Sequence, residues 1–167
     1  MYQLEQFTSK DIPKLLSWIP SEKEYLIWSG SGYKWPIDKN QLEQTLDKAR
    51  NSKLKYFLFK FIAGNSFVGY IELRKLESDE KISRIGRLII DPNQRGRGLG
   101  KELINAIKEY AKRKLNIHIL TLGVFSFNHS AISLYEKTGF IITDYRNKSG
   151  YFNNEKWELL LMECHLY

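Results

Sequence analysis

Apolar and polar residues alternate over several stretches of this chain, and a period of two residues is typical of half-buried β-strands. The clearest case is a pair of runs, 53–63 and 66–76, which flank the turn at 64–66 and predict a hairpin. Another run, rich in branched residues, ends at Asp91-Pro92, where proline stops a strand. The predicted strands occupy residues 2–7, 53–63, 66–76, 81–92, 117–127, 140–147 and 154–166.

Other stretches repeat their apolar residues every three or four positions, which predicts amphipathic helices. Residues 20–38 are interrupted by glycine and proline, and we expect them to be irregular or partly helical. The strongest helical stripe has an apolar residue at every fourth position: Leu99, Leu103, Ile107 and Ala111. Capping residues precede the other predicted helices: Thr8 or Ser9 for a helix through Trp18, Asp38 for the next, and Asn128 or Ser130 for a short helix that ends at Gly139.

The predicted elements follow the order β-α-α-β-β-β-α-β-α-β-β, with about seven strands and about four helices. This order indicates an α/β (α+β) chain in which helices cover a mixed sheet. The length of 167 residues, without an internal repeat or a linker, predicts a single domain over residues 1–167.

Composition excludes several classes of protein. No apolar run reaches the ~18 residues of a membrane-spanning helix, and the first residues lack a signal-peptide pattern, so we expect a cytoplasmic protein. The single Cys164 excludes an internal disulfide, and the three histidines lack metal-ligand spacing, so no metal site is expected. A net charge of +7 fits an anionic ligand or nucleic acid. Because the lysines are dispersed and no nucleic-acid-binding motif is present, we expect neither a nucleic-acid nor a membrane partner.

Residues 94–100 combine three glycines with two arginines directly before the strongest helical stripe. A strand, a glycine-rich turn and a helix N-terminus form an anion site, because N–H groups and the helix dipole point at the ligand. Two phosphate motifs are excluded. The first glycine of Walker A would fall on Arg95, and the third glycine of the dinucleotide fingerprint would fall on Lys101. A turn that binds no ligand is the alternative.

A second motif gives this loop a wider context. The loop reads Arg95-x-x-Gly98-x-Gly100, and after one helix and one strand comes NHSAISLYEKTGF at 128–140. Together the two motifs resemble the GNAT superfamily of acetyl-CoA-dependent N-acetyltransferases. The resemblance implies the GNAT fold, a mixed and mostly antiparallel sheet whose parallel strands splay apart at the coenzyme A site. The matching residues of the second motif are Asn128, Ala131, Leu134, Tyr135, Glu136, Lys137, Gly139 and Phe140.

The resemblance implies acetyl-CoA as co-substrate and assigns residues to its binding. The loop amides would cradle the pyrophosphate, since a Cβ would keep the backbone from approaching the phosphates. The pantetheine arm would lie against the strand before the loop, and Asn128 would bind it. The cofactor-binding residues implied are Leu88, Ile89, Ile90, Arg95, Gly96, Arg97, Gly98, Leu99, Gly100, Lys101, Asn128 and Tyr135.

The reaction implied is direct attack of an amine on the thioester in a ternary complex. Tyr135 matches the frequent general acid of the family, because a neutral phenol can protonate the departing thiolate. In the alternative, Tyr135 packs and binds the cofactor sulfur. An amide of Leu88, Ile89 or Ile90 would stabilise the oxyanion. Cys164 as an acetyl carrier is less favoured than a packed thiol.

The sequence departs from the family at the general base. Ribosomal-protein N-terminal acetyltransferases of this superfamily often place a glutamate at the position of Gly123, and no acid occurs in the strand before the loop. Glu72 is a candidate substitute, as is deprotonation through water. Trp28 and Tyr33 are candidate contacts for a cationic amine through cation–π interactions, or else members of a small aromatic core.

The acceptor class stays open at this level. Polyamines, peptide N-termini, lysine side chains, aminoglycosides and small metabolites all carry a suitable amine. A non-catalytic acyl-CoA-binding sensor on the same fold is the alternative function, because the strands lack an obvious base. The chain is expected to be a monomer or a homodimer.

Overall fold

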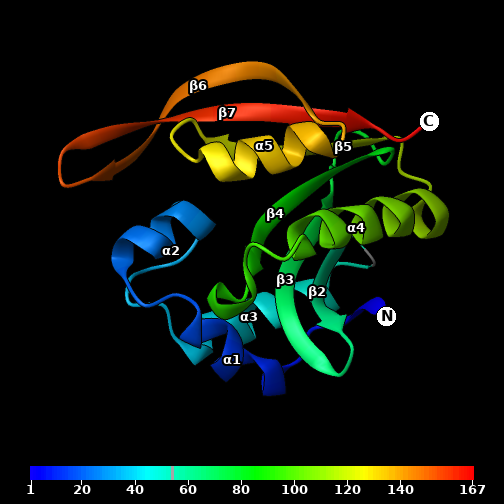
Figure 1. Ribbon diagram of the computed structural model, residues 1–167, viewed down its shortest axis with the longest axis horizontal. Helices are drawn as coiled ribbons and strands as arrows, with labels where there is room; N and C mark the ends of the chain where they lie inside the picture. The colour runs from blue at the N-terminus through cyan, green and yellow to red at the C-terminus, as the bar shows by residue number, and fades with distance from the viewer. Residues whose placement is uncertain (54) are drawn as a thin grey trace.

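The computed structural model describes the backbone of residues 1–53 and 55–167, and the side chains of these residues except 147–151. Leu54, in the predicted strand 53–63, lies outside the described residues. Within the described part, seven strands form one sheet in the order β1-β2-β3-β4-β5-β7-β6 (Figure 1). The strands are β1 (Tyr2–Gln6), β2 (Tyr56–Ala63), β3 (Ser66–Lys75), β4 (Ile82–Ile90), β5 (Ile119–Phe125), β6 (Ile141–Phe152) and β7 (Glu155–His165).

All neighbouring strands pair antiparallel except β4 and β5, which pair parallel. The mixed, mostly antiparallel sheet expected from the sequence is therefore confirmed. The predicted hairpin joins β2 to β3: Ala63 pairs with Ser66, and Gly64 in the turn adopts a φ of +62°. Glycine is favoured there because other residues rarely adopt a positive φ.

The described residues form five α-helices, one more than the pattern predicted. The additional helix is α2, within the segment expected to be irregular or partly helical. The Ser21 side chain caps it by accepting a hydrogen bond from the Glu24 amide, and Gly30 ends it. The segment is thus partly helical, and the pattern did not define the helix because only Tyr25 of it is buried. The helices are α1 (Ile12–Ser17), α2 (Glu22–Ser29), α3 (Lys39–Arg50), α4 (Leu99–Leu115) and α5 (His129–Lys137).

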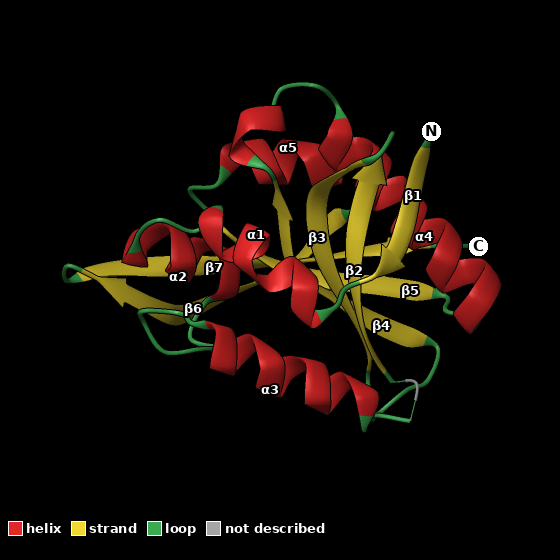
Figure 2. Ribbon diagram, turned by 90° about the horizontal axis from the view of Figure 1, so that it is seen from below, coloured by secondary structure: helices red, strands yellow, loops and turns green. Residues whose placement is uncertain are grey.

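Helices cover both faces of the sheet (Figures 1 and 2). Helices α4 and α5 pack against one face in a cluster that includes Leu103, Ile104 and Ile107, each fully buried. Helices α1, α2 and α3 pack against the other face, in a second cluster around Phe7 and Tyr70. The predicted stripe on α4 is confirmed, because its residues belong to the first cluster.

The parallel pair separates before it reaches the glycine-rich loop. Strands β4 and β5 pair only over residues 82–84 and 119–121, and both strands continue well beyond these pairs. The predicted splay of the parallel strands is confirmed. On the β3 side, β4 contains a bulge, because Tyr70 pairs with Ile89 and Glu72 pairs with Gly86. Arg87, inside the bulge, adopts a φ of +48°.

Candidate active site

A cleft of about 1140 Å³ opens where β4 and β5 separate. Its walls come from β3, β4 and β5, from α2, and from α5. The glycine-rich loop and the first turn of α4 close one end. The segments that the sequence singled out, the loop and the second motif, therefore meet at one site.

The glycine-rich loop is shaped to bring backbone close to a ligand. Gly96 and Gly98 each have a φ of +75°, and α4 begins directly after Gly98. A Cβ at Gly100 would lie 2.9 Å from Leu134 Cδ2, so glycine permits the close contact of α4 with α5. An open helix N-terminus beneath such a loop suits the pyrophosphate of coenzyme A.

The basic residues of the loop differ in where they lie. Arg95 and Lys101 line the cleft. Arg97 is among the residues of a separate small hollow beside β1, and its guanidinium donates to Gln94. Positive charge beside the loop amides therefore comes from Arg95 and Lys101.

The edge of β4 that faces β5 offers free backbone groups. The Asp91 amide donates to the Val68 carbonyl of β3 at 2.9 Å. Amides alternate in direction along a strand, so the Ile90 amide faces the gap between β4 and β5. The Ile90 carbonyl also faces outward, where Arg95 Nε donates to it at 3.3 Å. Leu88, Ile89 and Ile90 all line the cleft, in positions suited to the pantetheine arm.

Tyr135 lies in the cleft wall with most of its ring covered. The ring packs against Phe140, with centroids 5.8 Å apart, and the residue is 8% exposed. Burial raises the pKa of the Tyr135 hydroxyl to about 12. Within the described residues this hydroxyl has no hydrogen-bond partner. A protonated phenol is thus directed at the cleft with its donor unused.

Asn128, one of the two capping residues that the sequence offered, is the residue that caps α5. Its Oδ1 accepts from the Ala131 amide at 3.3 Å and from Ser130 Oγ at 3.2 Å. Asn128 also lines the cleft, so capping and ligand binding are compatible roles.

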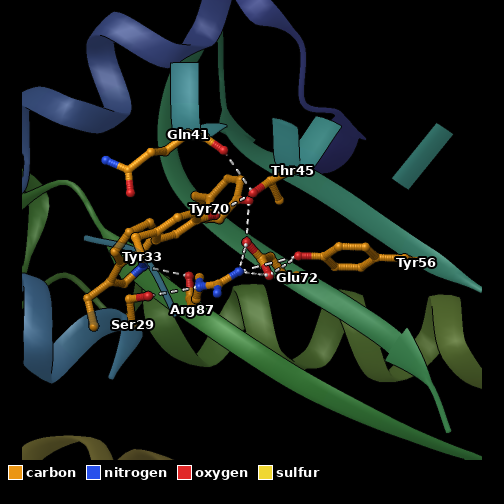
Figure 3. A network of polar contacts seen from close by, with 9 residues as sticks. Ser29, Tyr33, Gln41, Thr45, Tyr56, Tyr70, Glu72 and Arg87 are labelled. Atoms are coloured by element: carbon orange, nitrogen blue, oxygen red, sulfur yellow. Dashed lines mark hydrogen bonds and ion pairs between the residues drawn. The ribbon is translucent and has the colours of Figure 1, made fainter. Parts of the chain in front are cut away.

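Glu72, the candidate base, is buried and already engaged (Figure 3). Its carboxylate accepts from Arg87 Nη1 at 2.8 and 3.1 Å, from Tyr56 Oη at 2.5 Å and from Tyr70 Oη at 2.7 Å. Burial, followed by the charge of Glu72, raises the pKa of both tyrosines. This carboxylate is therefore paired with one arginine and accepts hydrogen bonds from two phenols.

Arg87 joins the bulge of β4 to α2 and the segment after it. Its Nε donates to Ser29 Oγ at 3.0 Å, and its guanidinium stacks 4.3 Å above the Tyr33 ring. Trp28 Nε1 donates to the Arg87 carbonyl at 2.8 Å. Figure 3 shows Ser29 and Glu72 on opposite sides of the Arg87 side chain. The bulge is therefore held in place by α2, by the loop segment that contains Tyr33, and by β3.

The aromatic residues proposed as acceptor contacts occupy different places. Trp28 lines the cleft, whereas Tyr33 lies beneath Arg87 and donates to or accepts from Thr45 Oγ1 at 2.9 Å. Tyr25 is buried in the core with α1 and α3, and Trp18 belongs to that core and also lines the cleft. Trp28 and Tyr33 are both partly buried and pack against this core, which is the alternative that the sequence left open.

Sequence reasoning missed three arginines of the cleft, namely Arg74, Arg84 and Arg87. The available signal for Arg84 and Arg87 was the stretch 83–90, a largely apolar strand in which one arginine precedes Gly86 and one follows it. The strand periodicity did not reveal Arg87 because the bulge there changes which side chains of β4 face the cleft.

Three other features bear on the chemistry. Cys164 is buried in the core with β5 and β7, away from the cleft lining. Among the described residues, no three His, Cys, Asp or Glu side chains are grouped to hold a metal ion. The helices of the described chain include none with the length and apolarity to cross a membrane.

Comparison with known proteins gives matches that agree with the site. The model of the acetyltransferase (GNAT) family matches residues 15–140. A spermidine N(1)-acetyltransferase of Vibrio cholerae is 32% identical over 79 residues, which is 47% of this chain and 45% of that protein. An uncharacterised N-acetyltransferase of Methanocaldococcus jannaschii is 40% identical over 60 residues, 36% of this chain and 26% of that protein. The matched segments thus span under half the length of these relatives.

A solved structure extends the likeness to nearly the whole fold. It is the spermidine N-acetyltransferase from Vibrio cholerae in complex with CoA and spermine. The TM-score is 0.84 at 20% identity, with 99% of this chain and 95% of that chain covered. At this identity the likeness establishes the arrangement of the elements.

Proposed function

Because this chain belongs to the GNAT acetyltransferase family, we propose that it transfers the acetyl group of acetyl-CoA to a primary amine by direct attack in a ternary complex. One observation carries the proposal: the open edge of β4 lies beside the glycine-rich loop and opposite Tyr135, in a single cleft. The acceptor is a small molecule or a peptide N-terminus, and residues 1–167 act as one acetyltransferase domain.

The residues present fit coenzyme A. The left-handed glycines and the N-terminus of α4 offer amides to the pyrophosphate, with charge from Arg95 and Lys101. The unpaired edge of β4 at Leu88 to Ile90 offers backbone groups to the pantetheine amides. When bound, acetyl-CoA supplies the activated thioester carbonyl.

The chain's own groups then act on that carbonyl and on the leaving sulfur. The Ile90 amide donates to the carbonyl oxygen, which gains negative charge as the amine nitrogen bonds to the carbon. Tyr135 donates its proton to the sulfur as the carbon–sulfur bond breaks. The nitrogen releases its second proton to solvent as the neutral amide forms, and the Tyr135 phenolate regains a proton from solvent.

The attacking amine must first lose a proton, since a free alkylammonium has a pKa near ~10.4. Glu72 is an unsuitable acceptor of this proton because Arg87, Tyr56 and Tyr70 already occupy its oxygens. Water in the cleft, which is open to solvent, is the acceptor that we propose.

The test is a thiol-release assay with acetyl-CoA and a panel of amines, run alongside Tyr135→Phe. Turnover with one class of amine, reduced in the variant, supports the proposal. Acetyl-CoA binding by calorimetry without any turnover would favour the acyl-CoA-binding sensor. The relatives that are named spermidine acetyltransferases make polyamines the first acceptors to include.

A further inference from the structure

The acceptor side of the cleft has little free negative charge. Among the described residues that line it, only Glu24 and Glu72 are acidic. Glu72 is buried and paired with Arg87. Glu24 lies exposed in the first turn of α2, where it accepts a hydrogen bond from Ser21 Oγ at 2.9 Å. A polyamine would therefore find no buried free carboxylate here.

Positive charge is concentrated at the same place. Arg74 on β3 and Arg84 on β4 are directly opposite each other in the sheet, and both line the cleft. Like charges directly opposite in a sheet are destabilising. The described residues form no ion pair with either guanidinium. An anion bound beside the two arginines would offset their repulsion.

Arg84 also lies at the point where the strands part. Its pairing with Thr121 is the last between β4 and β5. Arg84 Nη2 is 2.9 Å from where a Cβ of Gly123 would be, so glycine on β5 leaves room for the guanidinium. Partial burial, followed by the charges of Arg146 and Arg74, lowers the pKa of Arg84. The guanidinium is thus held among other cations at the mouth of the gap.

Arg74 is also held at the cleft. Its guanidinium stacks 4.3 Å from the centroid of the Tyr56 ring. Tyr56 lines the cleft and is fixed by its hydrogen bond to Glu72. Arg74 and Arg84 are exposed at the cleft and present planar donor groups, which suit carboxylates and phosphates.

We infer that the acceptor carries an anionic group, a carboxylate or a phosphate-type oxyanion, beside its amine, and that Arg74 and Arg84 bind this group. The inference rests on the proposed acetyl transfer and names its substrate class. Gly123 has a role in this arrangement. Where related enzymes often place a glutamate base, this chain has a glycine, which leaves space for the Arg84 guanidinium.

The acceptor class is tested by comparing kcat/KM for amines of different charge. The panel holds L-glutamate and β-alanine as carboxylates, phosphoethanolamine as a phosphate, spermidine as a polycation, and tyramine as a neutral-tailed amine. We expect at least about tenfold higher kcat/KM for an anionic amine than for spermidine. The carboxylate and phosphate members identify which oxyanion is preferred. A preference for spermidine or tyramine overturns the inference.

The residues are tested with Arg74→Gln and Arg84→Gln. We expect each to raise the KM for the anionic amine about tenfold or more, with the KM for acetyl-CoA unchanged. Arg113→Gln is the matched control, since that side chain is 77% exposed on α4 and pairs with Glu109 away from the cleft. Equal KM values in all three variants and the parent protein would contradict the assignment.

Failure of the proposed function gives a different result. If no amine is acetylated, calorimetry with CoA and phosphoethanolamine or L-glutamate still measures the anion site. Binding to the parent protein that Arg84→Gln abolishes and Arg113→Gln retains supports an anion site in a protein without this activity. Absence of binding to the parent protein overturns the inference itself.

Discussion

Tyr135 has the environment that bears most directly on the proposed chemistry. Burial raises the pKa of its hydroxyl to about 12, so the phenol stays protonated at neutral pH. A protonated phenol donates a proton and cannot accept one as a base. Its free donor in the cleft therefore fits the protonation of a leaving thiolate and excludes a part in deprotonating the amine.

Tyr135→Phe tests this role at the scale of one atom. We expect kcat to fall by about a hundredfold, the lower end for general acids, because thiolates leave readily even without help. The KM for acetyl-CoA should change little, since the ring and its packing on Phe140 remain. Steady-state kinetics with saturating amine measure both constants. A rise in KM at constant kcat would instead indicate a binding role.

The pH profile of kcat/KM gives a second readout of the same residue. Activity should rise with pH as the free amine becomes deprotonated. Because the pKa of Tyr135 is about 12, the parent protein should show no alkaline loss from this group below about pH 11. A profile that falls between pH 8 and pH 10 would show that another acid donates the proton.

The glycine-rich loop depends on backbone conformations that side chains disfavour. Gly98 has a φ of +75° with open space around its would-be Cβ, so alanine there strains the backbone without a clash. We expect Gly98→Ala to lower the free energy of unfolding by about 1 kcal/mol. It should also raise the KM for acetyl-CoA roughly fivefold or more, because the loop amides shift.

Gly64 provides a matched control for the loop. It has a φ of +62° in the β2–β3 turn, again with nothing near its would-be Cβ. Gly64→Ala should lose similar stability in urea denaturation while the KM for acetyl-CoA stays unchanged. Equal KM values for the two variants would show that the loop conformation does not serve cofactor binding.

The Glu72–Arg87 pair connects β3, the bulge of β4 and α2. Glu72→Gln would leave the Arg87 guanidinium, 17% exposed, without its counter-charge. We expect the free energy of unfolding to fall by about 3 kcal/mol, measured by urea denaturation. Arg50→Gln breaks an exposed pair with Asp47 and should cost about 0.5 kcal/mol or less. Similar losses in the two variants would mean that the buried pair does not stabilise the bulge.

For the molecule as a whole, most of the helices and strands could be predicted from hydrophobic periodicity and capping residues. The hairpin at Gly64, the cap at Asp38 and the stripe on α4 all follow local rules that the structure keeps. Helix α2 could not be defined by these local rules, because its apolar residues lie on no single face and only Tyr25 is buried. Tertiary contacts, such as that of Trp28 with the Arg87 carbonyl, hold it in place.

The site divides in a similar way. The glycine-rich loop and the second motif are short local patterns, so the sequence indicated that both belong to one site. The engagement of the Glu72 carboxylate could not be predicted from the sequence, because its partners are Arg87, fifteen positions away in the chain, and two tyrosines. The pairing of Arg74 with Arg84 depends on the register between β3 and β4, which alternation alone does not fix.

Buried tyrosines give the whole molecule a predictable response to alkali. Burial raises the pKa of Tyr33 and of Tyr135 to about 12 in the folded chain, whereas an unfolded tyrosine titrates near ~10. The folded state therefore keeps protons that the unfolded state loses. Stability from these groups is complete below about pH 10 and is lost as the pH rises toward about 12.

Urea denaturation at successive pH values measures this loss. Each such phenol contributes a slope of up to about 1.4 kcal/mol per pH unit above pH 10. Tyr135→Phe should make the slope less steep by up to that amount. Tyr145→Phe is the control, because Tyr145 is 60% exposed and meets solvent in both states. An unchanged slope in Tyr135→Phe would show that solvent reaches its hydroxyl freely, and would also remove the basis for a phenol that stays protonated through catalysis.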